Sequence, residues 1–150
     1  MKHRASFPIV IIVAFFSLTC LLLVMLVPSE TRHAKHAVDS FYSHEQRGDF
    51  SDSWELFHPL MKKKFSKGDY IEDRAHVFMS HFGVETFDYS LTKPKKVEDW
   101  RMSEEEEFVD VVYKVTVTQK YQSKYGRMNL VQDVYVAEED GEWLVIWDYQ

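Results

Sequence analysis

The seven histidines are the residues in this 150-residue chain that could most readily support metal chemistry. His33 and His36 lie three positions apart in one segment of helical periodicity, and His76 and His81 lie in another. Cys20 is the single cysteine, and the chain has neither the Cys-x-x-Cys nor the His-Glu-x-x-His pattern of zinc sites. The sequence therefore predicts no metal site and no bound cofactor.

The acidic residues form no pair at catalytic spacing. The run Glu104–Glu107 lacks the glycine and the Asp/Asn spacing of a calcium loop, which indicates a solvated turn. The formal net charge is −6 and the sequence pI is about 5.6. This balance argues against nucleic acid as a partner, because phosphate binding requires a basic face. The sequence predicts no catalytic residue.

The elements that would have to position any site begin with a helix over residues 30–47. Gly48 is expected to end this helix because glycine tolerates positive φ. Its charged residues, Glu45 among them, are expected away from the apolar face. That face has helical spacing and comprises Ala34, Ala37, Val38, Phe41 and Tyr42.

Two more helices are expected in close succession. Asp49 can cap the second, in which Phe50, Trp54 and Phe57 share one face and Trp54 is expected to be a core anchor. Pro59 interrupts this pattern, and residues 60–65 could add one more turn. Ser66 is expected to cap the third helix, over residues 66–82.

From Glu85 the apolar period changes to two, which is typical of strands. Strands are expected at residues 85–91, 97–102, 108–120, 127–137 and 143–149. Lys93–Lys96, which contains Pro94, separates the first two of these ranges and indicates an edge strand or a strand with a bulge. Asp140-Gly141 favours a tight hairpin. Helices followed by antiparallel strands indicate an α+β fold, with three helices packed on one face of a curved antiparallel sheet.

The run from Phe7 to Val27 has no charged residue and the length of a transmembrane helix, which needs about 20 apolar residues. The expected organisation is a cytoplasmic tail over residues 1–6, an uncleaved transmembrane anchor over 7–27 and a folded domain over 30–150 outside the cytoplasm. A cleavable signal peptide is the alternative, although its apolar region is usually about 7–15 residues.

A set of core and capping residues resembles the NTF2-like superfamily. The similarity is to the small NTF2-like domain that precedes the transpeptidase in membrane-anchored penicillin-binding proteins of Gram-positive bacteria. It covers residues 30–150 and implies a cone-shaped fold. The matching residues are Phe41-Tyr42, Gly48-Asp49-Phe50, Trp54-Glu55-Leu56-Phe57, Lys64-Phe65-Ser66-Lys67 and Asp69-Tyr70.

The resemblance implies a non-catalytic interaction or accessory module at the cell envelope, bound to the membrane by a single-pass anchor. The chain ends after the small domain, so transpeptidase activity is not expected. Some enzymes of this fold, such as dehydratases and isomerases, place an Asp or His inside the cone. The candidates here are Asp88, Gln132, Asp133 and His81, whereas the best strand presents an apolar face. A small-ligand-binding domain, or an enzyme that uses the cone interior, is the alternative function.

The last strand is apolar on both faces. Alternation places Trp143, Val145, Trp147 and Tyr149 on one face and Leu144 and Ile146 on the other. Leu144 and Ile146 are therefore expected to form a partner surface, for an envelope protein or for self-association. The alternative is that another segment of the chain, such as residues 93–102, covers this second face.

Overall fold

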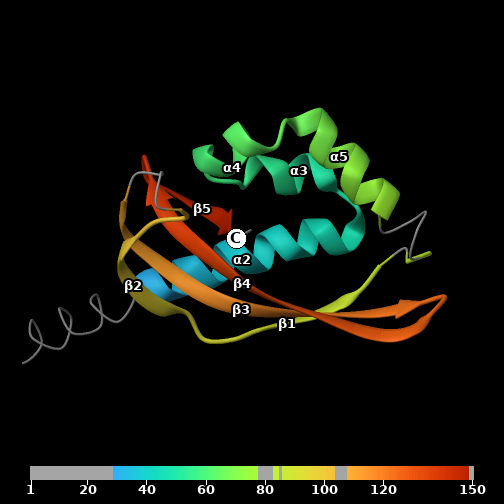
Figure 1. Ribbon diagram of the computed structural model, residues 1–150. Helices are drawn as coiled ribbons and strands as arrows, with labels where there is room; N and C mark the ends of the chain where they lie inside the picture. The colour runs from blue at the N-terminus through green and yellow to red at the C-terminus, as the bar shows by residue number, and fades with distance from the viewer. Residues whose placement is uncertain (1–28, 78–82, 85, 104–107, 149–150) are drawn as a thin grey trace, which may run out of the picture.

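The computed structural model describes residues 29–77, 83–84, 86–103 and 108–148. Within these ranges the chain forms four helices followed by one antiparallel sheet, which is an α+β fold. Figure 1 shows α2 crossing the sheet, with the other three helices on the side of α2 that faces away from it. The described helices are α2 (Glu30–Arg47), α3 (Phe50–Glu55), α4 (Pro59–Lys64) and α5 (Lys67–Ala75).

The expected fold class was wrong in the number of helices. The described residues form four helices rather than three, because Pro59 starts the separate helix α4 at the position where proline is favoured. No helix in the described part of the chain is long and apolar enough to cross a membrane. The run 7–27, in which the transmembrane helix was expected, lies outside the described residues.

Local capping chemistry accounts for some of the helix ends, although the expected cap Asp49 precedes α3 without a capping hydrogen bond to its side chain. Gly48 has φ 75°, and its N–H bonds back to Glu45 O, so it ends α2 as expected. The Ser66 side chain accepts a hydrogen bond from Asp69 N and starts α5. The expected third helix extended to residue 82, whereas α5 ends at Ala75 and residues 78–82 lie outside the described part.

The sheet is built around the long β3–β4 hairpin. Its strands lie in the order β1-β3-β4-β5, and β2 also pairs with β3. β1 and β2 pair with successive parts of β3: Leu91 of β1 pairs with Val117, and Lys95 of β2 pairs with Lys114. The expected interruption around Pro94 is confirmed. The strands are β1 (Asp88–Leu91), β2 (Lys95–Trp100), β3 (Val109–Ser123), β4 (Gly126–Glu139) and β5 (Glu142–Trp147).

The free edge of β5 is covered by the connection between α3 and α4. His58 N donates to Val145 O at 2.9 Å, and Val145 N donates to Leu56 O at 2.8 Å. Phe57 thus forms a parallel bridge with Val145, 88 positions along the chain from it (145 − 57). This bridge satisfies polar groups of an edge strand that would otherwise be available to another chain.

Candidate functional site

An aromatic cluster fills the space between α2, β5 and α5. Phe57 lies at its centre, with its ring centroid 4.9 Å from Phe41, 4.9 Å from Trp147 and 5.1 Å from Tyr70. Phe41 and Phe57 are fully buried. Tilted and edge-to-face ring contacts add to the free energy of apolar burial. The interior of the fold is therefore packed with large rings at this point.

The expected core anchor of the second helix has a different environment. Trp54 is only partly buried, and its Nε1 donates to Phe65 O at 3.0 Å. The amino groups of Lys62 and Lys67 lie 5.1 Å and 5.5 Å from its ring centroid. The residue at the centre of the aromatic cluster is instead Phe57. It lies beyond α3, which ends at Glu55.

A buried carboxylate lies beside the aromatic cluster. Glu45, in the last turn of α2, is 2% exposed. Its Oε1 accepts hydrogen bonds from Ser53 Oγ and Tyr70 Oη, each at 2.6 Å. Its Oε2 accepts from Arg74 Nε at 2.6 Å and also from Arg74 Nη2. Donors from α3 and α5 thus engage both oxygens of Glu45.

The charges in this network fix the protonation of its members. Burial, together with the negative charge of Glu45, raises the pKa of Tyr70 far above that of a free tyrosine. The phenol therefore keeps its proton and donates a hydrogen bond to Glu45. Burial opposes the charge of Arg74, but the Glu45 carboxylate more than offsets this and the pKa of Arg74 is raised. The Arg74 guanidinium also lies 5.5 Å from the Trp147 ring centroid.

Glu45 lies on the buried face of α2, so the expectation that it lies away from the apolar face was wrong. Residue 45 is one turn after Phe41, so it continues the buried stripe of α2. A charged residue at that spacing signals a buried ion pair, but the spacing does not identify Arg74 as its partner. That pairing arises only because α5 packs close to the end of α2.

One donor of the interior makes no hydrogen bond to a described residue. Nε1 of Trp147 is buried and has no acceptor in hydrogen-bond geometry among the described residues. The indole nevertheless lies close enough to the Tyr42 hydroxyl to lower the pKa of Tyr42. Burial is the stronger effect and raises the pKa of Tyr42 overall. The Tyr42 hydroxyl donates to Gln132 Oε1 at 3.3 Å.

A second buried titratable residue, His58, caps α4. It is 6% exposed, and its Nδ1 accepts a hydrogen bond from Leu60 N at 3.3 Å. Nε2 therefore carries the proton of the neutral ring. Nε2 lies 3.4 Å from Oε2 of Glu139, an ion-pair distance, but the atoms do not have hydrogen-bond geometry and Nε2 has no other partner among the described residues. Burial lowers the pKa of His58, and Glu139 opposes this only in part.

His58 lines an open cleft of about 630 Å³, which we call the His58 cleft. Its walls come from the start of α2, the start of α4, strands β2 and β3, and the β4–β5 hairpin. Trp143 and Tyr113 form part of the wall, with ring centroids 5.6 Å apart, and the Tyr113 hydroxyl donates to Glu30. Nothing in the spacing of these residues identified the site.

The charged residues that line the His58 cleft are mostly acidic. Lys96 is the single lysine among them, and it donates to Glu98 at 2.8 Å. The carboxylates of the lining are Glu30, Asp110, Glu138 and Glu139. With His58 neutral, the lining carries a net negative charge, which attracts cations.

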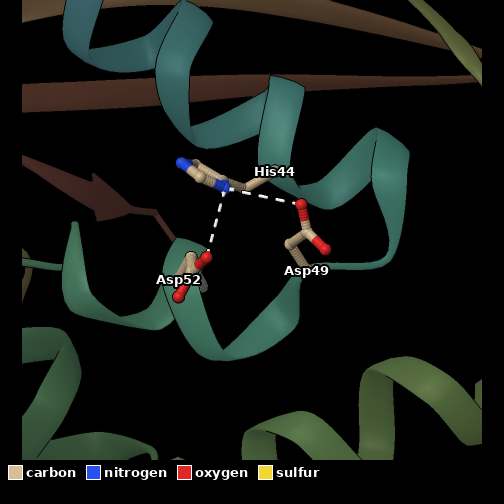
Figure 2. A group of neighbouring side chains, drawn as sticks. All are labelled: His44, Asp49 and Asp52. Atoms are coloured by element: carbon tan, nitrogen blue, oxygen red, sulfur yellow. Dashed lines mark ion pairs between the residues drawn. The ribbon is translucent and has the colours of Figure 1, made fainter.

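Figure 2 shows the group of possible metal ligands found among the described residues, His44 on α2 with Asp49 and Asp52 at the start of α3. His44 Nδ1 lies 3.8 Å from Asp49 Oδ2 and 3.9 Å from Asp52 Oδ2. Arg47 already approaches two of these atoms, with Nη2 3.1 Å from His44 Nδ1 and Nε 2.9 Å from Asp49 Oδ2. Because the Arg47 guanidinium already lies against these ligands, the geometry does not favour a metal ion.

The expected polar candidates for the cone interior do not converge. Asp88 is exposed, and Asp133 pairs with Lys114 at 2.5 Å and Thr116 at 2.6 Å. Lys114 lowers the pKa of Asp133, which is the behaviour of a surface ion pair. Gln132 contacts Tyr42, and His81 lies outside the described residues.

The histidines with helical spacing also remain apart from any acidic cluster. The His33 ring stacks on Trp143 with centroids 5.8 Å apart. His33 and His36 line a second cleft, of about 590 Å³, together with Lys62 and Glu55. This arrangement does not bring a third metal ligand next to the pair within the described residues.

Leu144 and Ile146 are buried, with 8% and 0% of their surface exposed. Ile146 pairs with Tyr135, whose ring centroid lies 4.7 Å from that of Trp100 at the end of β2. This packing favours the alternative explanation, in which the chain covers its own second face. A partner role for Leu144 and Ile146 stays a prediction.

The chain matches no protein-family model and no curated protein.

Proposed function

We propose that the folded part of this chain is a non-catalytic binding module with the NTF2-like architecture that its sequence resemblance implies. The observation that supports this proposal is the state of Glu45. Among the described residues it is the one buried carboxylate, and its two oxygens are engaged by Ser53, Tyr70 and Arg74.

A general base must be free to take a proton from a substrate. Glu45 is instead ion-paired and fully hydrogen-bonded, and the space beside it is filled by aromatic rings. These are properties of a structural ion pair, and they leave the surface of the domain as the place for recognition. A position at the cell envelope rests only on the hydropathy of residues 7–27, so it stays a prediction and is no part of this proposal.

The experiment that tests the proposal is the substitution Glu45→Gln, with unfolding followed in urea. Removing one partner of a buried ion pair leaves the other charge uncompensated and costs about 3–5 kcal/mol. We therefore expect a large loss of stability. An active-site carboxylate behaves in the opposite way, because catalytic sites are commonly strained and their replacement stabilises the fold.

The matched control is Glu55→Gln, which removes the same charge from an exposed carboxylate paired with Lys67 at 2.5 Å. Exposed ion pairs contribute little, so this variant should lose much less stability than Glu45→Gln. A Glu45→Gln protein as stable as the wild type, or more stable, would show that the interior carboxylate is held under strain. The proposal of a non-catalytic module would then fail.

A further inference from the structure

The His58 cleft combines two features that together recognise organic cations. Glu30, Glu138 and Glu139 supply negative charge, and the partly exposed ring of Trp143, which packs on the buried Tyr113, supplies an aromatic surface. A cation over an aromatic ring is attracted by the quadrupole of that ring. A carboxylate beside the ring adds a charge-assisted hydrogen bond.

His58 provides an independent sign that the cleft is incomplete without a ligand. Its Nε2–H is a buried donor with no hydrogen bond among the described residues, although Nε2 lies 3.4 Å from Oε2 of Glu139. A buried donor without a partner costs free energy. That cost is relieved if a bound cation holds the Glu139 carboxylate in line with the imidazole, because one oxygen can then accept from His58 while the other binds the cation.

We propose that the His58 cleft binds the side chain of a lysine or arginine carried by a peptide segment of a partner protein. This inference rests on the proposed function and names the partner chemistry of the module. The volume of about 630 Å³ lies within the usual range for a ligand site. Apolar lining from Pro59, Leu60, Val109 and Val111 extends beyond the carboxylates, and it offers contacts to residues that flank the basic side chain.

The test is a titration of the full 150-residue chain with the peptide acetyl-Ala-Lys-Ala-amide, followed by the indole N–H signals in a nitrogen-15 NMR spectrum. Trp143 lines the cleft and Trp147 lies in the interior, so their signals separate the two regions. We expect a saturable shift of the Trp143 signal and no shift of the Trp147 signal. The same peptide with an acetylated lysine keeps the stem but lacks the charge, and it should give no saturable shift.

Two variants test the site itself. Glu139→Gln should weaken binding of the lysine peptide about threefold to fivefold, the usual value of a partly exposed ion pair. Glu72→Gln removes the same charge from an exposed residue of α5 that does not line the cleft, and it should leave binding unchanged. An unchanged Trp147 signal would verify that each variant is folded.

The proposal is overturned if the peptide leaves the Trp143 signal unmoved, or if both variants weaken binding equally. Butylamine supplies the cation without a peptide. If butylamine binds as tightly as the peptide, the site takes free amines and the assignment to a partner segment is wrong. None of these results changes the stability test of Glu45, so the binding-module proposal would stand or fall separately.

Discussion

Two buried titratable residues behave differently because their surroundings differ. Both oxygens of Glu45 accept hydrogen bonds, from Ser53, Tyr70 and Arg74. Among the described residues His58 has no hydrogen bond at Nε2, and Glu139, which lies 3.4 Å from it, is about half exposed. Burial alone therefore does not decide the role of a titratable group. The number of partners within hydrogen-bond distance does, and it separates a structural ion pair from a candidate binding residue.

The titration of His58 should be visible in the stability of the protein. Burial lowers its pKa below the ordinary histidine value of about 6.5. As the pH falls below the ordinary pKa of about 6.5, the unfolded chain takes up a proton at His58 before the folded chain does. The free energy of unfolding therefore falls until the folded-state pKa is passed.

The variant His58→Asn keeps a side-chain acceptor at the N-cap but lacks the titrating ring. Between about pH 7.5 and about pH 5, the wild type should lose more stability than this variant. Urea denaturation of both proteins across this range measures the difference. Two parallel stability curves would mean that His58 titrates normally in the folded protein.

At the scale of elements, the sheet has two apolar faces of unequal extent. The face toward α2 is buried along most of β3, as at Val115, and around Val134 and Val136 of β4. The opposite face is buried only near β2 and β5, where Trp100 packs on Tyr135. Further along β4, Val131 lies on this opposite face and is 61% exposed. The covered part of the second face therefore belongs to the core.

This difference gives a paired prediction for one face of the sheet. Ile146→Ser should destabilise the protein by about 2–5 kcal/mol, the usual cost of removing a large buried aliphatic side chain. Val131→Ser alters an exposed residue of the same face and should change stability by less than about 0.5 kcal/mol.

Thermal melting of the two variants compares them directly. A wild-type melting temperature for Ile146→Ser, with loss of self-association, would restore β5 as a partner surface.

At the scale of the whole molecule, the contact between Phe57 and Val145 joins the helical half of the chain to its last strand. The bridge places Leu56, Phe57 and His58 along β5, although they lie between two short helices. Short helices are marginal on their own, and tertiary packing supplies most of their stability. The bridge thus fixes α3 and α4 against the sheet and also positions His58 beside the cleft.

Hydrogen exchange should report this long-range connection. The amides of His58 and Val145 donate across the bridge at 2.9 Å and 2.8 Å, so we expect both to exchange only with global unfolding. Their exchange free energies should equal that of a central β3 amide such as Val115. Fast exchange of His58 with slow exchange of Val115 would show that the helical half opens independently of the sheet.

The sequence alone determined most of the secondary structure of this protein. Gly48 ends α2, Ser66 caps α5, and Asp140 and Gly141, with φ of 52° and 85°, turn the β4–β5 hairpin. These features depend on backbone conformation and on hydrogen bonds between near neighbours, so the residue type is sufficient to predict them. The same local reasoning located the interruption around Pro94 between β1 and β2.

Only the tertiary structure decided which residues form sites. Glu45 and Arg74 lie 29 positions apart, and His58 and Glu139 lie 81 apart (139 − 58). Local periodicity contains no information about such pairs, because they depend on how α5 packs against α2 and on how the α3–α4 connection pairs with β5. The burial of Leu144 and Ile146 has the same origin: alternation shows that both faces of a strand are apolar, but which segment covers each face is set by packing between elements distant in the chain.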